Sequence, residues 1–294
     1  MSQPAAVIDV GSNTVRLVVA RRESLPTPVH TDKATPGLGR EIEACGRLSG
    51  TAIATTADTV RRFCADARAH GAASIEVLVT APGRQAENGA ELVEAIERAA
   101  GILVRVLSPE EEAELAFAGA VAVASPSAPV VAVVDLGGAS TELAVGCAGE
   151  GPSWVRSVDL GAVRLTHRLL DATHPAPKDV EAAREAVAEA FSGVTPPLPG
   201  AALAVGGSVR ALGRVVGRCL ARGELAASAS ILPACSAETL VERFDVSKQR
   251  APLLLAAALI LSEVQQRLVV PLEVADGGVR EGALLLGRRE AEAA

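Results

Sequence analysis

The sequence predicts an α/β protein built from two similar halves. Strand-like apolar runs alternate with helix-like stretches along the 294 residues, and one strand–turn–strand pattern occurs twice. Residues 7–19 and 133–145 align without a gap, so that Asp9 falls on Asp135 at an offset of 126 residues. A spacing this long indicates a duplicated domain rather than a solenoid repeat. We therefore expect two α/β domains, with a cleft between the paired hairpins.

The first half follows this alternation element by element. Each repeat has an apolar strand, a turn of small polar residues and a second strand, which is typical of a hairpin. Between the two repeats, apolar periodicity and closing glycines predict a helix, a strand, a helix and a strand. We expect these four elements at residues 51–70, 75–80, 90–100 and 102–107.

The second half continues in the same way. Strands are expected near 130–135 and 201–205, and the stretch Gly193–Gly200, with three prolines, is expected to be a loop. Helices are expected near 178–191, 209–222, 237–244 and 252–268. The most apolar run, Leu253–Leu261, is far shorter than the roughly 20 residues that span a membrane, so it predicts a buried helix.

Composition limits the function classes. The net charge is −7, and aromatic residues make up 2% of the chain. An acidic chain with few rings for base stacking is unlike a nucleic-acid binder, although a local basic site for a phosphorylated molecule remains open.

Cysteine usage and the first residues bear on the compartment. The five scattered cysteines show no close pairing, which is typical of reduced thiols. The first residues lack the basic and apolar regions of a signal peptide. We expect a cytoplasmic protein.

The turns of the two repeats suit an anionic ligand. Small residues after each first strand let backbone N–H groups approach an anion. The carboxylates of Asp9, Asp135 and Glu142 can hold a divalent cation, mostly through water. An ordinary hairpin with side-chain-capped turns is the alternative for one copy. Two copies in register favour the binding hypothesis.

A third glycine loop, Ala204–Arg210, follows a strand and opens a helix. Ser208 is a candidate N-cap, and the helix N-terminus would offer N–H donors to an anion; a plain strand–helix turn is the alternative. Arg210 begins a ladder of arginines spaced four apart, which continues with Arg214, Arg218 and Arg222. The ladder is either a solvated helix face or a track that prefers long polyanions.

One stretch of carboxylates has both a structural and a catalytic interpretation. Ser108, followed by Pro109 and by Glu111 at the third helical position, predicts a capping box. Glu112 is not needed for the cap and is a candidate general base. Arg84 is either a loop charge or a phosphate clamp. The four histidines show no metal-ligand spacing.

Taken together, these stretches resemble the exopolyphosphatase / guanosine pentaphosphate phosphatase (Ppx/GppA) family. The matching segments, in order along nearly the whole chain, are 8–14, 79–86, 108–113, 134–142, 206–208 and 276–282. The resemblance implies two ribonuclease-H-like domains of the actin, Hsp70 and sugar-kinase superfamily. It places the first at residues 1–115 with a returning helix at about 282–294, and the second at residues 116–281.

The resemblance also implies roles for single residues. Glu112 matches the family's catalytic glutamate, and Asp9, Asp135 and Glu142 match the positions that hold Mg²⁺ and water. Together with the glycine-loop reading, it gives the expected phosphate-binding set: Ser12, Asn13, Arg84, Gly137, Gly138, Ser140, Gly207, Ser208 and Arg210.

Two departures from the family pattern stand out. Ala139 occupies a position where the family typically has glycine, and a positive φ there would strain the backbone. The chain also ends soon after the segment Arg280–Gly282, so we expect the short two-domain form without an accessory helical region.

The expected function is hydrolysis of terminal phosphoanhydride bonds of inorganic polyphosphate. Hydrolysis of the 5′ γ-phosphate of pppGpp is the nearest alternative, followed by a kinase of the same fold and by a non-catalytic sensor of (p)ppGpp or polyphosphate. The expected partners are inorganic polyphosphate or pppGpp, with no nucleic acid and no membrane. A homodimer is one assembly open to the chain, and the sequence does not decide it.

Overall fold

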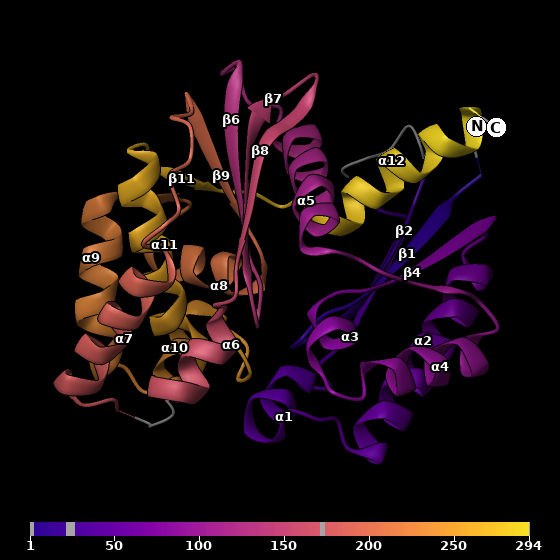
Figure 1. Ribbon diagram of the computed structural model, residues 1–294, viewed down its shortest axis with the longest axis horizontal. Coiled ribbons are helices and arrows are strands. Elements are labelled where there is room, and N and C mark those ends of the chain that lie inside the picture. Colours follow the sequence, from indigo (N-terminus) through magenta and orange to yellow (C-terminus); the bar gives the residue numbers. More distant parts are fainter. Residues whose placement is uncertain (1–2, 22–26, 171–173, 294) are drawn as a thin grey trace. The chain divides into compact units, whose positions relative to one another are not determined.

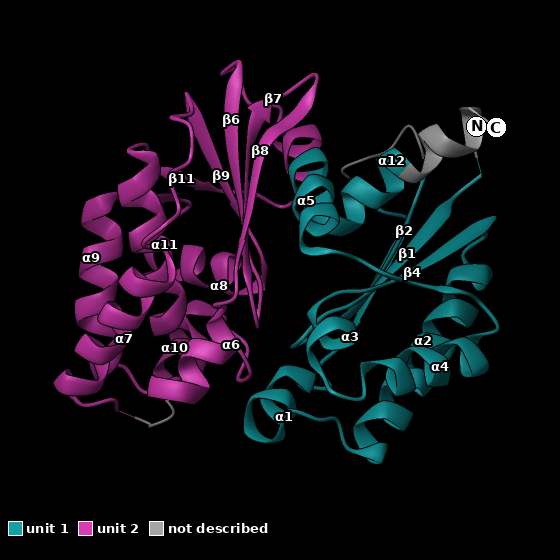
Figure 2. Ribbon diagram, viewed as in Figure 1, with its two compact units in different colours: residues 1–119, 277–294 teal, residues 120–276 magenta. Residues whose placement is uncertain are grey.

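The computed structural model describes residues 3–21, 27–170 and 174–293, of which 287–293 are described as backbone only. It divides into two compact units, coloured separately in Figure 2. Unit 1 comprises residues 1–119 and 277–294, and unit 2 comprises residues 120–276.

Unit 1 has a five-stranded mixed sheet in the order β3-β2-β1-β4-β5. Its strands β2, β1 and β4 are labelled in Figure 1. The hairpin of β1 and β2 is antiparallel, β3 continues it antiparallel, and β4 and β5 run parallel to β1. The strands are β1 (Ala5–Val10), β2 (Val15–Ala20), β3 (His30–Ala34), β4 (Ser74–Val79) and β5 (Val104–Val106).

Helices cover both faces of this sheet, because alternate residues of the central strands are apolar on each face. On one face Ile8 and Leu17 pack in a core with Phe63, and on the other Val7 packs in a core with Leu115. The helices are α1 (Leu38–Cys45), α2 (Gly50–Ala69), α3 (Ala81–Gln85), α4 (Gly89–Ala100), α5 (Pro109–Ala124), which runs into unit 2, and α12 (Val279–Ala293).

Unit 2 repeats the same topology in its six-stranded sheet, whose order is β10-β11-β9-β6-β7-β8. Five of its strands, in the order β8-β7-β6-β9-β11, have the same parallel and antiparallel pairings as strands β3-β2-β1-β4-β5 of unit 1. The strands are β6 (Val130–Leu136), β7 (Thr141–Cys147), β8 (Gly151–Val158), β9 (Ala201–Val205), β10 (Cys219–Leu220) and β11 (Leu272–Val274). The expected duplication and the two-domain α/β fold are confirmed, and the strand order is the ribonuclease-H-like one that the resemblance implied.

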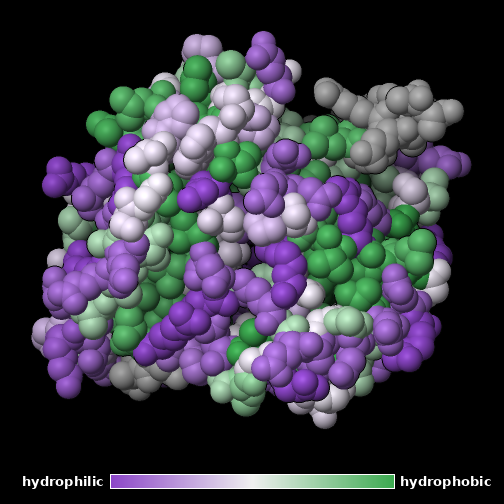
Figure 3. Space-filling view, in the orientation of Figure 1, coloured by the Kyte–Doolittle hydropathy of each residue, from purple (hydrophilic) through white to green (hydrophobic). Residues whose placement is uncertain are grey.

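The helices of unit 2 surround the buried helix α11 (Leu254–Leu268), whose residues Leu254–Leu261 are all buried as expected from their apolar run. The others are α6 (Ala162–Leu165), continued by a π-helical turn at Thr166–Leu170, α7 (Pro177–Ala190), α8 (Gly207–Val216), α9 (Arg222–Ile231) and α10 (Ala237–Phe244), with 3₁₀ turns at Leu232–Ala234 and Ala251–Leu253. Within the described residues, no helix is both long and apolar enough to cross a bilayer. On the face drawn in Figure 3, hydrophilic residues are widespread and apolar residues form separate patches.

The helix expected at 209–222 is wrong beyond Val216. Gly217 adopts a φ of 100° and ends α8, and a short strand and a new helix follow. Arg218 and Arg222 therefore lie outside the helix that carries Arg210 and Arg214, and the four-residue ladder does not exist. A helix cannot pass through a backbone conformation that only glycine adopts readily.

Candidate phosphate-binding and catalytic site

The two hairpin turns have the same hydrogen bond. The Gly11 N–H donates to the Thr14 carbonyl at 3.0 Å, and the Gly137 N–H donates to the Ser140 carbonyl at 3.0 Å. Each turn follows a strand that carries an aspartate at the equivalent position. The repeat seen in the sequence is therefore a repeat in backbone geometry.

The two aspartates differ in the residue opposite them. Asp9 pairs across the ladder with Arg16, whereas Asp135 pairs with Glu142. Unit 1 thus sets opposite charges side by side, and unit 2 sets two carboxylates side by side. Like charges directly opposite destabilise a ladder unless a cation lies between them.

Asp9 lies in a charged surrounding. Burial raises the pKa of the Asp9 carboxyl, while the charges of Arg280 and Arg16 lower it and that of Glu281 raises it. Arg280 and Glu281 come from the start of α12, so the beginning of this helix meets the first hairpin within unit 1. Among the described side chains, Arg280 Nε and Glu281 Oε2 are buried without a hydrogen-bond partner.

The acidic pair of unit 2 suits a hard divalent cation. Glu142 is buried and accepts a hydrogen bond from Ser157 Oγ at 2.9 Å, which fixes its carboxylate. Gly206 passes close by: a Cβ there would lie 3.4 Å from Asp135 Oδ1. Two carboxylates, with water and substrate oxygens, form a donor set typical of Mg²⁺. Within the described part of the chain no three His, Cys, Asp or Glu side chains gather into a complete metal cage.

Glu112 lies in unit 1 in an ion pair with Arg84. Arg84 Nη2 donates to Glu112 Oε2 at 3.0 Å, and Arg84 Nη1 donates to the carbonyl oxygen of Leu107. Both side chains are largely buried, with 17% and 11% of their surface exposed. Arg84 stands on the short helix α3 and Glu112 in the first turn of α5, so the bond ties two elements together.

The capping box at the start of α5 is confirmed. Ser108 Oγ accepts the Glu111 N–H at 3.1 Å, and Glu111 Oε2 accepts the Ser108 N–H at 2.7 Å. Hydrogen bonds from Arg105 and Ser108 lower the pKa of the Glu111 carboxyl. Glu111 thus holds the helix end, which leaves Glu112 for the pair with Arg84.

The third glycine loop differs from expectation at Ser208. The N-cap of α8 is Gly206, with a φ of 119°, and Ser208 is the second helical residue. A Cβ at Gly206 would lie 2.5 Å from the Leu136 carbonyl oxygen, so the close approach of two strand ends requires glycine. Ser208 is fully buried, and its hydroxyl accepts a hydrogen bond from Arg250 Nη1 at 3.0 Å.

Arg250 is a candidate site residue that the sequence analysis did not single out. Its guanidinium lies at the start of α8 beside the expected phosphate-binding residues Ser208 and Arg210. Burial and the charge of Arg210 lower its pKa to about 10. A partly buried guanidinium near another arginine is stabilised by an anion. No local pattern marks Arg250, which is 42 residues from Ser208.

Ala139 causes no strain at the second loop. The described non-glycine residues with positive φ are Ser125, Asp245 and Val269, so Ala139 adopts an ordinary backbone conformation and is buried. The conditional strain expected for a positive φ at this position therefore does not arise.

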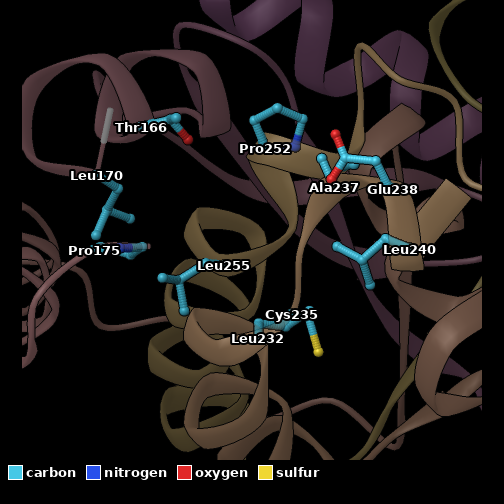
Figure 4. A pocket seen from close by; sticks show the side chains of 11 residues that line it. Thr166, Leu170, Pro175, Leu232, Cys235, Ala237, Glu238, Leu240, Pro252 and Leu255 are labelled. Carbon is cyan, nitrogen blue, oxygen red and sulfur yellow. The ribbon is translucent and has the colours of Figure 1, made fainter. Parts of the chain in front are cut away.

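A separate cavity in unit 2 has a different character (Figure 4). It measures about 370 Å³ and is lined mostly by apolar side chains such as Leu240 and Leu255. Its one ionisable carboxylate is that of Glu238, among the lining residues described. An apolar cavity with an acidic wall does not suit a polyanion.

The structure groups the expected site residues by unit. Unit 1 holds Asp9, Ser12, Asn13, Arg84 and Glu112; unit 2 holds Asp135, Gly137, Gly138, Ser140, Glu142, Gly207, Ser208 and Arg210. Ser12 and Ser140 are buried at equivalent hairpin turns. Asn13 contributes a buried side-chain nitrogen, Nδ2, that has no hydrogen-bond partner among the described atoms.

Comparison with known proteins identifies the family. A family model, that of the Ppx/GppA phosphatase family, matches residues 17–288. Exopolyphosphatase 1 of Mycobacterium tuberculosis is 29% identical over 310 residues, which cover 98% of this chain and 88% of that protein. Exopolyphosphatase 2 of the same species is 35% identical over 196 residues, which cover 63% of this chain and 60% of that protein.

Solved structures show the same architecture. The Aquifex aeolicus member of the Ppx/GppA family has a TM-score of 0.82 at 26% identity, over 98% of each chain. An exopolyphosphatase from Cytophaga hutchinsonii, 20% identical, has a TM-score of 0.84 over 96% of this chain and 97% of that one, which shows the fold alone. Fold and hairpin loops together define a two-domain α/β protein of ribonuclease-H-like topology. The chain belongs to the Ppx/GppA phosphatase family.

Proposed function

We propose that this protein is an exopolyphosphatase that releases orthophosphate from the ends of inorganic polyphosphate, with Glu112 as the group that orients the attacking water. The observation that carries the proposal is the buried Glu112 carboxylate, held at one oxygen by Arg84. A carboxylate fixed in this way keeps a defined orientation, which general-base catalysis requires. The mycobacterial exopolyphosphatases to which the chain is similar support the same substrate class.

The residues of the two hairpins would bind the phosphoryl groups. Ser12 and Asn13 in unit 1, and Gly137, Gly138 and Ser140 in unit 2, offer N–H, amide and hydroxyl donors without long side chains in the way. Gly207, Ser208, Arg210 and Arg250 add an N-terminal helix turn and two guanidinium groups. Donors of this kind stabilise the charge that develops on phosphoryl oxygens during transfer.

Mg²⁺ fits the pair of Asp135 and Glu142, and Asp9 is a further acidic position for it. Bound there, the ion would neutralise phosphoryl charge. The chain's own contribution is geometric: Ser157 orients Glu142, and the β6–β7 ladder sets Asp135 opposite it. Glu112 accepts the proton of the water, and Arg84 holds the carboxylate that accepts it.

Hydrolysis of the 5′ γ-phosphate of pppGpp uses the same groups and remains the second candidate. Arg250 does not separate the two candidates, because its charge would serve any phosphorylated ligand equally. Neither substrate requires a membrane or a nucleic acid, and we expect the protein in the cytoplasm.

The deciding experiment measures orthophosphate release from long-chain polyphosphate, tripolyphosphate, pppGpp and ATP, each with and without Mg²⁺. The proposal expects the highest kcat/KM on long-chain polyphosphate and no activity after removal of Mg²⁺ with EDTA. A higher kcat/KM on pppGpp would make the second candidate the function. Binding of these ligands without any phosphate release would instead indicate a sensor.

A further inference from the structure

In each unit, carbonyl oxygens of the hairpin loop accept hydrogen bonds from a second glycine-containing segment of the same unit. In unit 2 the Gly137 carbonyl accepts the Ala162 N–H at 3.1 Å. The Gly138 carbonyl accepts two bonds, from the Val163 N–H at 2.8 Å and the Arg164 N–H at 3.1 Å. The three donors are the first N–H groups of α6. The N-terminus of this short helix therefore donates its hydrogen bonds to the loop rather than to a ligand.

Unit 1 has a related arrangement, which coincides with that of unit 2 at the Ser12 carbonyl, the equivalent of Gly138. The Ser12 carbonyl accepts the Gly39 N–H at 2.6 Å, and the Asn13 carbonyl accepts the Gly37 N–H at 3.4 Å. Gly37 and Gly39 stand at the start of α1, as Gly161 stands at the start of α6. The duplication therefore includes this second segment as well as the hairpin.

These bonds decide which way the loop N–H groups point. In a planar trans peptide the C=O of one residue and the N–H of the next lie on opposite sides. When the Gly137 and Gly138 carbonyls face α6, the N–H groups of Gly138 and Ala139 face away from it. The same geometry turns the N–H groups of Asn13 and Thr14 away from α1. Aligned N–H groups of this kind form an anion-binding concavity.

We propose that Gly161 in unit 2 and Gly39 in unit 1 are positioning residues that hold the phosphate loops in their binding conformation; this rests on the proposed function of those loops. Gly161 is needed for space. A Cβ there would lie 2.5 Å from both the C and the O of Gly138 and 2.7 Å from the Ala139 nitrogen. All three are backbone atoms, so the loop itself would have to move. At Gly39 a Cβ would lie 3.0 Å from Ser12 Cβ and 3.3 Å from its carbonyl oxygen, a milder clash.

Two further contacts fix the segment around Gly161. Thr141 Oγ1 donates to the Leu160 carbonyl at 2.6 Å, next to the loop. Arg164, with 5% of its side chain exposed, donates to the Asp159 carbonyl at 3.0 Å and to the Asp159 carboxylate. A rigid support of this kind makes a small displacement costly at the site it holds.

The test compares Gly161→Ala and Gly39→Ala with two controls, Gly193→Ala and Gly50→Ala. Both control glycines have open space at the Cβ position and no positive φ. Amide hydrogen exchange of residues 136–141 and 11–14 is followed with and without tripolyphosphate, together with phosphate release. A loop that binds phosphate through its N–H groups exchanges more slowly when tripolyphosphate is present.

The expected result is that Gly161→Ala loses the tripolyphosphate protection at 136–141 and lowers kcat/KM by about 100-fold, while the controls match wild type. Gly39→Ala is expected to lose less, because its clash is milder, and it serves as the test should Gly161→Ala fail to fold. A folded Gly161→Ala that keeps wild-type protection and turnover would overturn the inference. So would a wild-type protein whose loops show no protection. Protection without hydrolysis in wild type would remove the proposed function alone.

Discussion

Arg84 donates to Glu112 Oε2 at 3.0 Å and through its other terminal nitrogen to the Leu107 carbonyl. The expected phosphate clamp is thus also the partner of the expected base. A guanidinium has five N–H donors, so Arg84 retains donors for a phosphoryl oxygen while it holds the carboxylate. In the function proposed above, the pair would couple the orientation of the water-activating group to the position of the phosphoryl group.

Neighbouring glutamates should separate chemistry from stability. Glu112→Gln is expected to fold normally and to lower kcat on polyphosphate by about 100-fold or more, because the amide cannot accept the water proton. Glu111→Gln is expected to keep kcat and lower the melting temperature by a few degrees, because it weakens the capping box. Phosphate release and calorimetry on both variants check this, and Glu110→Gln, at an exposed position, is the control.

The Glu111 effect should depend on pH. Its pKa is lowered in the folded protein, so its stabilisation is present above the unfolded value of 4.5 and is lost as the pH falls through the folded value. The stability difference between wild type and Glu111→Gln should therefore be present at pH 7 and shrink below pH 4.5. Near wild-type turnover in Glu112→Gln would remove Glu112 from the mechanism.

Replacing Arg84 should lower the rate. Arg84→Gln removes the cation that holds Glu112 Oε2 and that also donates to the Leu107 carbonyl. We expect kcat on polyphosphate to fall by about tenfold or more, because the carboxylate is no longer held in a fixed orientation. Arg84→Lys should recover part of the rate because it restores the charge, and Arg61→Gln, on the surface of α2, is the control. A wild-type kcat in Arg84→Gln would mean that the ion pair does not bear on the base.

Local sequence patterns predict much of the fold but few of the contacts between side chains. The hairpins, the buried α11 and the capping box all follow from spacing within a few residues. Ser208 is the predicted N-cap of α8, but Gly206 occupies that position. The Leu136 backbone, 70 residues earlier in the chain, excludes any side chain at Gly206. Arg84 and Glu112 are 28 residues apart, and Arg250 and Ser208 are 42 apart. Such contacts depend on how sheets and helices pack, which periodicity does not encode.

Replacing Arg250 should raise the stability of the protein and weaken its binding of phosphate groups. Its pKa is lowered to about 10, so the folded protein holds this proton less tightly than the unfolded chain, and the charge costs stability at every pH below 10. Arg250→Met is expected to raise the melting temperature at pH 8 by a few degrees and to lose most of the stabilisation that pyrophosphate gives to wild type. Thermal unfolding with and without pyrophosphate measures both, with Arg222→Met as the exposed control. A less stable variant that responds fully to pyrophosphate would contradict the assignment.

The acidic pair of unit 2 should set the metal requirement. Glu142→Gln and Asp135→Asn are each expected to raise the Mg²⁺ concentration for half-maximal activity by at least tenfold, because each removes one anionic ligand. Without Mg²⁺ both variants should be more stable than wild type, because the repulsion across the ladder is relieved. Magnesium titrations of phosphate release and calorimetry test the two effects, with Glu150→Gln as the control. Variants with wild-type magnesium dependence would place the ion elsewhere.

Chain-length preference should not depend on the arginines beyond Arg210. Arg214 donates to the Asp245 carboxylate at 2.9 Å, and Arg218 donates to the Asp276 carboxylate at 3.0 Å, so each already has a partner. Gly217 also separates them by ending α8. Reversing the charge of both, by Arg214→Glu and Arg218→Glu, is therefore expected to leave the ratio of kcat/KM on long and short polyphosphate within about twofold of wild type, because screened surface charges contribute little. A preference for long chains that falls with both substitutions, and falls further with salt, would restore the track that the sequence pattern had indicated.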